Sequence, residues 1–147
     1  MDEREEHAQR EAELWAEFES LLSRVPEDRL NDPGVLGGTW TIKEMLHHVT
    51  GWMRECSVHL EAIAAGTFAP PDESDEITDA RNAAFAEEAR GMDVAQVRGA
   101  LDAAREDVLR RWAELPEIDD DAVEWFVGET YEHYEEHLPD LELASGA

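Results

Sequence analysis

The chain has 147 residues, enough for one domain with a sizeable buried core, and 42% of them are hydrophobic, which excludes a disordered acidic tail. Its 37 acidic residues against 12 basic ones give a formal net charge of −25, so we expect neither nucleic acid nor an anionic membrane as a direct partner. Two origins of this acidity stay open: adaptation to molar salt, which screens the repulsion between carboxylates, and a genome composition that favours Arg, Ala, Asp and Glu over Lys.

Cellular location is indicated by the N-terminus, which is charged where a signal peptide would need an apolar stretch. The chain also lacks a continuous apolar run long enough for a membrane-spanning helix. The single cysteine, Cys56, excludes an internal disulfide, and a small buried residue on a helix is a simpler use for it than a reactive thiol. We therefore expect a cytoplasmic protein.

The first predicted element is an amphipathic helix over about residues 2–25, in which apolar side chains recur at helical spacing before Pro26 ends it. Glycines and Pro33 between residues 31 and 38 indicate a loop. Thr39 or Thr41 then caps a second helix that runs to about Ala65. Its expected core stripe consists of Ile42, Met45, Leu46, Val49, Trp52, Met53, Cys56, Leu60 and Ile63.

Residues 66–74, with Pro70 and Pro71, interrupt the helical pattern. A short helix over about 78–90 and a longer one over about 94–115 follow. Carboxylates at 119–121 cap a last helix that we expect to end at about Leu138, before Pro139. Strand-like alternation does not compete with this pattern. We predict an all-α fold, in which residues 1–147 form a single domain with four main helices and one short extra helix packed as a bundle.

Two histidines near the C-terminus, His133 and His137, have the spacing of metal ligands. A helix places residues four apart on one face, one turn from each other. Both imidazoles should point inward, at one edge of the apolar stripe of Val123, Val127 and Tyr134. Such pairs also arise by chance on amphipathic helices, so the pair alone is a weak sign of a metal site and a third ligand is needed to support it.

Angular position on the second helix selects the third histidine. His48 flanks the apolar stripe of this helix, whereas His47 lies about 100° further round, on the charged face, where we expect it to be solvated. His59 lies about 16 Å further along the same helix, too far for a shared ion, and we expect it to be partly exposed. A site formed by His48, His133 and His137 follows.

Three neutral imidazoles leave a divalent ion with vacant positions for water or a thiolate, and the ion lowers the pKa of either ligand. The ligand type makes zinc and nickel the leading candidates, with iron and manganese also open. Glu44, Glu55 and Glu129 lie near enough on their helices to accept the outer N–H of a ligand histidine, although a solvated helix face is the more common use of such residues. Trp52 and Tyr131 are candidates for the pocket mouth, although core packing is the more common use of both.

The histidines lie in segments that resemble a known family. The segment from Trp40 to Trp52, which contains His48 eight residues after Trp40, is similar to a motif of DinB-like proteins. The pair His133 and His137 is similar to their C-terminal HxxxH motif. Residues 77–82 and the helix after them are also similar, so the resemblance covers nearly the whole chain. It is closest to the DinB-like proteins of the ClbS/DfsB group and to the N-terminal domains of mycothiol-dependent maleylpyruvate isomerases.

The resemblance implies a four-helix bundle of up-down-down-up order, often dimeric, in which residues 66–74 and the short helix supply a long crossover. It also implies a divalent metal held by His48, His133 and His137. DinB-like proteins include thiol transferases that use bacillithiol or mycothiol, isomerases and hydrolases, so the fold does not name the reaction.

We therefore expect a metal-dependent enzyme, either a thiol-dependent transferase or a hydrolase, that acts on a small-molecule substrate and forms a homodimer. A low-molecular-weight thiol is the candidate cosubstrate. Two other classes stay open, namely a binding protein with a structural metal and a helical dimerisation domain whose histidines only pack.

The net charge leads to a prediction about salt. If the acidity is an adaptation to molar salt, the Tm should rise substantially between dilute buffer and molar KCl, because a Debye length of about 3 Å screens the repulsion between carboxylates. Thermal unfolding followed by circular dichroism measures this change. A Tm that stays flat over this range would leave genome composition as the explanation of the charge.

Overall fold

The computed structural model describes residues 1–33, 38 and 40–146. In this part of the chain the regular elements are all helical, which confirms the all-α fold class there. Among the helices of the described residues, none is both long and apolar enough to cross a membrane. The elements are α1 (Glu3–Ser23), the 3-10 turn η1 (Glu27–Arg29), α2 (Ile42–Ala65), α3 (Asp75–Arg90), α4 (Val94–Glu114), α5 (Asp120–Glu129) and α6 (Tyr131–Ala144).

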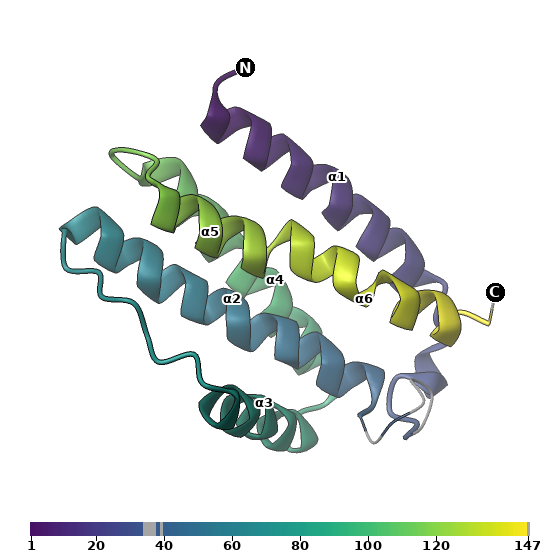
Figure 1. Ribbon diagram of the computed structural model, residues 1–147. Helices are drawn as coiled ribbons and strands as arrows, with labels where there is room; N and C mark the ends of the chain where they lie inside the picture. Colours follow the sequence, from purple (N-terminus) through teal and green to yellow (C-terminus); the bar gives the residue numbers. More distant parts are fainter. Residues whose placement is uncertain (34–37, 39, 147) are drawn as a thin grey trace.

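The helix α2 lies at the centre of the molecule and contacts α3, α4, α5 and α6 (Figure 1). At its start, the Lys43 ammonium donates to the carbonyl of Met92, just before α4, at 2.7 Å. Near its end, Glu61 lies 3.3 Å from Arg111, close to the end of α4. These contacts show that α2 and α4 run parallel. A parallel neighbour is possible here because residues 66–74 and α3 carry the chain back along the length of α2 before α4 begins (Figure 1).

The helices α1 and α6 run in the opposite direction to α2 and α4. At the start of α1, the Arg4 guanidinium donates to the carbonyls of Trp112 and Leu115 at the end of α4. Beyond the end of α1, Arg29 donates to the carbonyl of Ala144 at the end of α6, at 3.0 Å. The helix α1 therefore packs antiparallel to α4 and parallel to α6.

Local capping groups set where the helices begin. The Thr41 hydroxyl accepts from the backbone N–H of Glu44 at 3.0 Å, and the Glu44 carboxylate accepts from the N–H of Thr41 at 3.4 Å, which forms a capping box. Of the two candidate caps, Thr41 is thus the N-cap of α2, and Thr39 lies outside the described residues. Asp119 caps α5, as the carboxylate cluster predicts. The helix α2 ends at Ala65, and the C-cap Gly66 that follows has a left-handed φ of 74°.

The C-terminal region differs from the prediction of one helix that ends before Pro139. Thr130 separates α5 from α6 with φ −114° and ψ −101°, and its hydroxyl donates to the Phe126 carbonyl at 2.6 Å. The expectation that Pro139 ends the helix was wrong, because α6 continues through it to Ala144. Proline removes one backbone N–H from the helix, but Leu141 and Ala144 beyond it are fully buried, which offsets that loss.

The core follows the predicted apolar stripes closely. In α2 the stripe is buried except for Trp52 and Ile63, which are partly exposed. The helix α3 begins at Asp75, three residues before the predicted start, because Ser74 accepts the N–H of Ile77 as its cap. The other helices bury Leu14, Trp15, Phe18 and Leu22 of α1, Val97, Leu101, Ala104, Val108 and Trp112 of α4, and Phe126 of α5.

A buried ion pair joins three helices around the carboxylate of Glu11 on α1, which is 1% exposed. Arg105 on α4 donates to it through Nε at 2.8 Å and Nη2 at 2.9 Å, and Tyr134 on α6 donates through its hydroxyl at 2.9 Å. Burial raises the pKa of Tyr134 well above its usual range, and the charge of Glu11 adds to this shift. The Tyr134 hydroxyl therefore keeps its proton and remains a donor.

Replacing Glu11 by alanine should lower the free energy of unfolding by about 3 kcal/mol, because a buried carboxylate with two partners is removed and Arg105 loses its counter-charge. Urea unfolding followed by tryptophan fluorescence measures the change. Glu13→Ala on the same helix is the control, since its pair with Arg10 at 3.5 Å is exposed and should be worth less than about 1 kcal/mol. Equal losses in the two variants would contradict the role of Glu11.

Candidate metal centre

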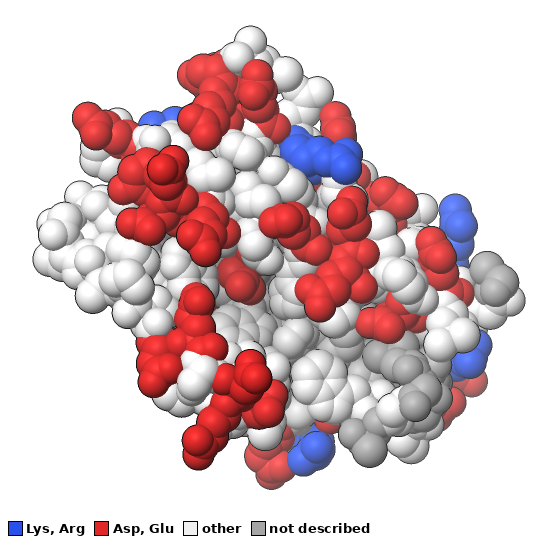
Figure 2. All heavy atoms as spheres, in the orientation of Figure 1, with Lys and Arg blue, Asp and Glu red and all other residues white. Residues whose placement is uncertain are grey.

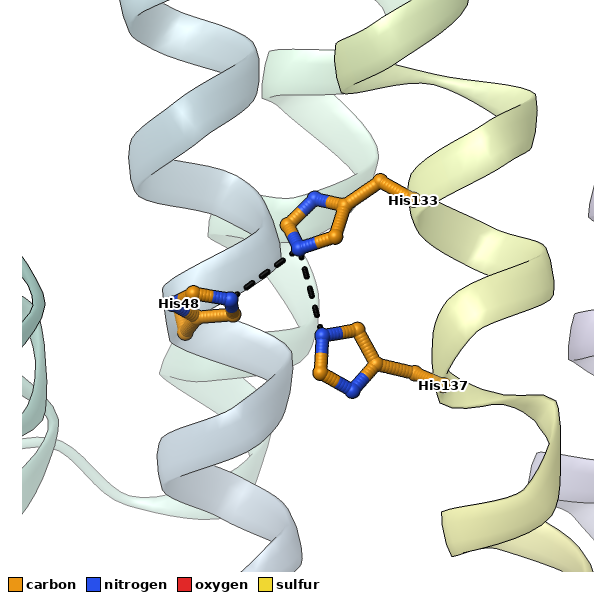
Figure 3. Close-up of side chains that lie close together, drawn as sticks. All are labelled: His48, His133 and His137. Carbon is orange, nitrogen blue, oxygen red and sulfur yellow. Dashed lines mark hydrogen bonds between the residues drawn. The ribbon is translucent and has the colours of Figure 1, made fainter. Parts of the chain in front are cut away.

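The helices α2 and α6 bring together the three histidines that the sequence selects (Figure 3). The Nε2 atom of His48 lies 3.0 Å from the Nε2 atom of His133, which lies 3.2 Å from the Nε2 atom of His137. His133 and His137 lie one turn apart on α6, so their four-residue spacing places both rings on one face of the helix, as the sequence predicts. One ring nitrogen from each of the three lies within 4.8 Å of the others.

These distances fit a shared ion. Ligand nitrogens about 2.0–2.1 Å from zinc lie about 2.9 to 3.4 Å apart for coordination angles between octahedral and tetrahedral values. The two Nε2 separations, 3.0 and 3.2 Å, fall in this range. The ligand nitrogens of the third pair, His48 and His137, lie within 4.8 Å of each other, so the three side chains can face one divalent ion after adjustment of their rotamers.

The protonation state of the cluster also suits a cation. Burial lowers the pKa of His133 to about 2 and that of His48 to about 4, and the neighbouring imidazoles add to both shifts. Both rings are therefore neutral at neutral pH, as metal ligands must be. The Nε2 atom of His133 faces two other ring nitrogens with only one lone pair or one proton, so it cannot make a good hydrogen bond to each of them.

An outer hydrogen bond orients one of the three rings. The Asp140 carboxylate lies 2.8 Å from Nδ1 of His137, an arrangement that metal-bound histidines usually show. Glu129 lies beside His133 as predicted, but its carboxylate is 3.8 Å from Nδ1, beyond hydrogen-bond distance. Among the described residues, Nδ1 of His48 and Nδ1 of His133 have no hydrogen-bond partner.

The other two candidate acceptors have different roles. The Glu44 carboxylate takes part in the capping box of α2 and lies 3.5 Å from Arg90. The Glu55 carboxylate lies 2.7 Å from Arg81 and 3.1 Å from Nε2 of His59. Both residues thus stabilise contacts that do not involve the histidine cluster.

The expectations for His47 and His59 were wrong. His47 is fully buried, and its Nε2 atom lies 3.0 Å from the Glu88 carboxylate on α3. His59 is 9% exposed, and its ring lies 4.2 Å from the ring of Trp125 on α5. Angular position on α2 assigned His47 to the charged, solvent-facing side, but α3 covers that side in the folded chain. His59 was expected to be partly exposed, but α5 covers it.

A pocket of about 370 Å³ lies beside the histidine cluster. Its lining comes from α2, α3, α5, α6 and the segment 66–74, and it includes His48 and His133. Trp52 lines the pocket as predicted, whereas Tyr131 lies outside the lining and forms a hydrogen bond with Nδ1 of His7 at 2.9 Å. The lining residues are His48, Trp52, Glu55, Pro71, Asp72, Glu73, Ile77, Thr78, Arg81, Asn82, Trp125, Gly128, Glu129, His133 and Glu136.

The pocket carries an excess of negative charge. Five acidic side chains line it, and Arg81, the cation among the lining residues, is paired with Glu55. Burial raises the pKa of Glu129 to about 8, and the charges of Glu136, Glu73 and Glu55 add to the shift, so Glu129 itself contributes little of this charge at neutral pH. Figure 2 shows acidic side chains around a hollow on this face of the molecule.

Close packing between α2 and α3 fixes one wall of the pocket. A Cβ atom at Gly51 would lie 2.6 Å from the ring of Phe85, so glycine is what allows α3 to approach α2 at this point. The next residue, Trp52, donates its indole N–H to the side-chain oxygen of Asn82 on α3 at 2.7 Å. These contacts hold the lining residues of α2 and α3 in place.

Two residues of the site, Asp140 and Trp125, were missed by sequence reasoning, and a third, Trp40, was named as part of a motif but given no role in the site. Asp140 was missed because the last helix was expected to end before Pro139, although its position three residues after His137 was a usable signal. The Trp40 ring packs on His48 with 4.9 Å between ring centroids. Trp125 lines the pocket from α5, and no local pattern in the sequence marks it as facing α2.

The sequence of the chain matches the model of one protein family, described as the mycothiol maleylpyruvate isomerase N-terminal domain, over residues 12–133. The matched part includes His48 and His133, and His137 lies just beyond it. No curated protein and no solved structure matches the chain. The finer resemblance to the ClbS/DfsB group stays a prediction. Because the match spans well over half of the residues, the chain belongs to the mycothiol maleylpyruvate isomerase N-terminal domain family, a DinB-like family.

Proposed function

We propose that this chain is a metal-dependent enzyme domain in which His48, His133 and His137 hold a divalent ion beside a pocket for a small molecule. The observation that carries the proposal is the convergence of three Nε2 atoms at separations of 3.0 and 3.2 Å, with two of the rings in the pocket wall. Neutral imidazoles favour zinc or nickel among common divalent ions.

An open coordination position is part of the proposal. Structural zinc sites usually have four protein ligands, whereas the cluster offers three. When bound, a divalent ion at this position acts as a Lewis acid that lowers the pKa of a coordinated thiol or water. The chain's own residues would position this chemistry, since His48 and His133 face the pocket and Asp140 orients the ring of His137.

The reaction class that we propose is thiol-dependent transfer with a low-molecular-weight thiol as cosubstrate. The support is the printed description of the family, which names mycothiol. Hydrolysis of a small molecule is the alternative, because the same open position accepts water. We also propose that α1, α2, α4 and the interrupted pair α5–α6 form a four-helix bundle of up-down-down-up order and that the chain is a homodimer.

Removal of any one ligand should abolish stoichiometric metal binding. His48→Ala, His133→Ala and His137→Ala should each purify with well below one ion per chain, because two imidazoles hold a divalent ion much more weakly than three. Asp140→Asn should weaken metal affinity by about 10- to 100-fold through the lost support of His137. Metal analysis after equilibration with zinc, and the rise in Tm that zinc produces, measure the effect.

His47→Gln is the matched control for the ligand variants. It changes the histidine next to His48, and glutamine keeps a group able to hydrogen-bond with Glu88. This variant should bind metal as the unmodified chain does. Full metal content in His133→Ala would remove the proposed triad, and an equal loss in His47→Gln would show that the effect is general unfolding.

Cobalt substitution tests whether the coordination position is open. A thiol or azide that enters the position should change the visible absorption spectrum of the cobalt-loaded protein, because its ligand field and coordination number change. A response to thiols with a weak response to azide would favour thiol-dependent transfer over hydrolysis. A fully cobalt-loaded chain whose spectrum responds to neither would have a closed, structural site, which favours the non-catalytic class.

A further inference from the structure

We infer that the pocket beside the three histidines selects a small molecule that carries an organic ammonium group, and that it rejects dicarboxylates. The inference rests on the proposed function, because it takes this pocket to be the place where the substrate binds. It adds the charge class of that substrate. The charges, the aromatic lining and the unsatisfied polar atoms of the pocket carry it, in that order.

The charges of the lining favour a cation. Glu55 is paired with Arg81 at 2.7 Å, but no Lys or Arg side chain in the described part of the chain lies within ion-pair distance of Asp72, Glu73 or Glu136. A wall with unpaired carboxylates attracts a positive group and repels a carboxylate ligand. Even a divalent ion on the histidines would leave the carboxylates of the lining in excess over its positive charge.

The aromatic residues of the pocket favour an organic cation over a hydrated inorganic one. Trp52 and Trp125 line it from α2 and α5, and a tryptophan face attracts ammonium groups through its quadrupole. Both rings are held in place, Trp52 by its hydrogen bond to Asn82 and Trp125 by contact with the ring of His59. Acidic groups beside fixed aromatic faces are what an ammonium group with an apolar body requires.

Buried polar atoms show that the pocket is built for a ligand and is more than an acidic surface depression. His133 is 6% exposed and His48 is 9% exposed, and both line the pocket. Among the described residues, Nδ1 of each lacks a hydrogen-bond partner. Unsatisfied buried polar atoms are uncommon in folded proteins, so a water or a hydrogen-bond acceptor of the bound molecule, separate from its ammonium group, is expected beside them.

A matched series of four-carbon molecules tests the inference, namely 1,4-diaminobutane, butane-1,4-diol and succinate. The indole N–H resonances of Trp52 and Trp125 report binding in an NMR titration, and those of the core residues Trp15 and Trp112 serve as internal controls. The titrations use the purified protein with its metal content measured, and are repeated after chelation. The diamine should bind at least about tenfold more tightly than the diol, and succinate more weakly than either.

Two charge-removal variants locate the effect. Asp72→Asn with Glu73→Gln should weaken diamine binding about tenfold, because two carboxylates of the pocket are lost. Glu17→Gln with Glu106→Gln removes the same charge from exposed positions outside the lining and should change binding less than about twofold. Thermal unfolding checks that all variants remain folded.

Several outcomes would overturn the inference. They are succinate binding as tight as diamine binding, absence of diamine binding at millimolar concentration, and equal weakening in both double variants. A preference for the diamine that disappears on chelation would also overturn it, because the metal would then be the source. Failure of the proposed function can be distinguished from failure of this inference. If the chain binds no metal but still prefers the diamine, the metal centre is wrong and the charge selection stands.

Discussion

The burial of α2 on several sides is the constraint on which the fold and the candidate site both depend. Its buried positions include three histidines besides the apolar stripe, so the neighbouring helices must supply partners for polar groups as well as apolar contacts. The helix α3 supplies Glu88 for His47, and α6 supplies His133 for His48. A central helix with polar buried positions therefore decides where each neighbour lies.

The polar groups of the core fall into two kinds with different consequences. The network of Glu11, Arg105 and Tyr134 is complete, and it joins α1, α4 and α6 as a rigid frame. By contrast, two buried ring nitrogens of pocket-lining residues, Nδ1 of His48 and Nδ1 of His133, have no hydrogen-bond partner among the described residues. The polar groups of the network around Glu11 therefore satisfy one another, whereas these two nitrogens beside the pocket still lack a hydrogen-bond partner.

The surface and the pocket are both negatively charged, so the acidic composition of the chain and the proposed preference of the pocket for cations have the same sign. Acidic side chains spread over the face that carries the hollow (Figure 2), so the field outside the pocket points the same way as the field inside it. The pocket carboxylates Asp72, Glu73 and Glu136 are exposed, so salt screens their attraction for a cation as it screens the rest of the surface charge. Charge selection in the pocket should therefore weaken as the salt concentration rises.

Local sequence determined the all-α class, most helix starts and the separation of His133 from His137, because capping and helical spacing act within a few residues. Only tertiary packing decided that α6 continues past Pro139 and that Asp140 reaches His137, since the burial of Leu141 and Ala144 comes from other helices. Tertiary packing also buried His47 under α3 and brought Trp125 to the pocket. Angular position on one helix selects a face, but the neighbouring helices decide whether that face meets solvent.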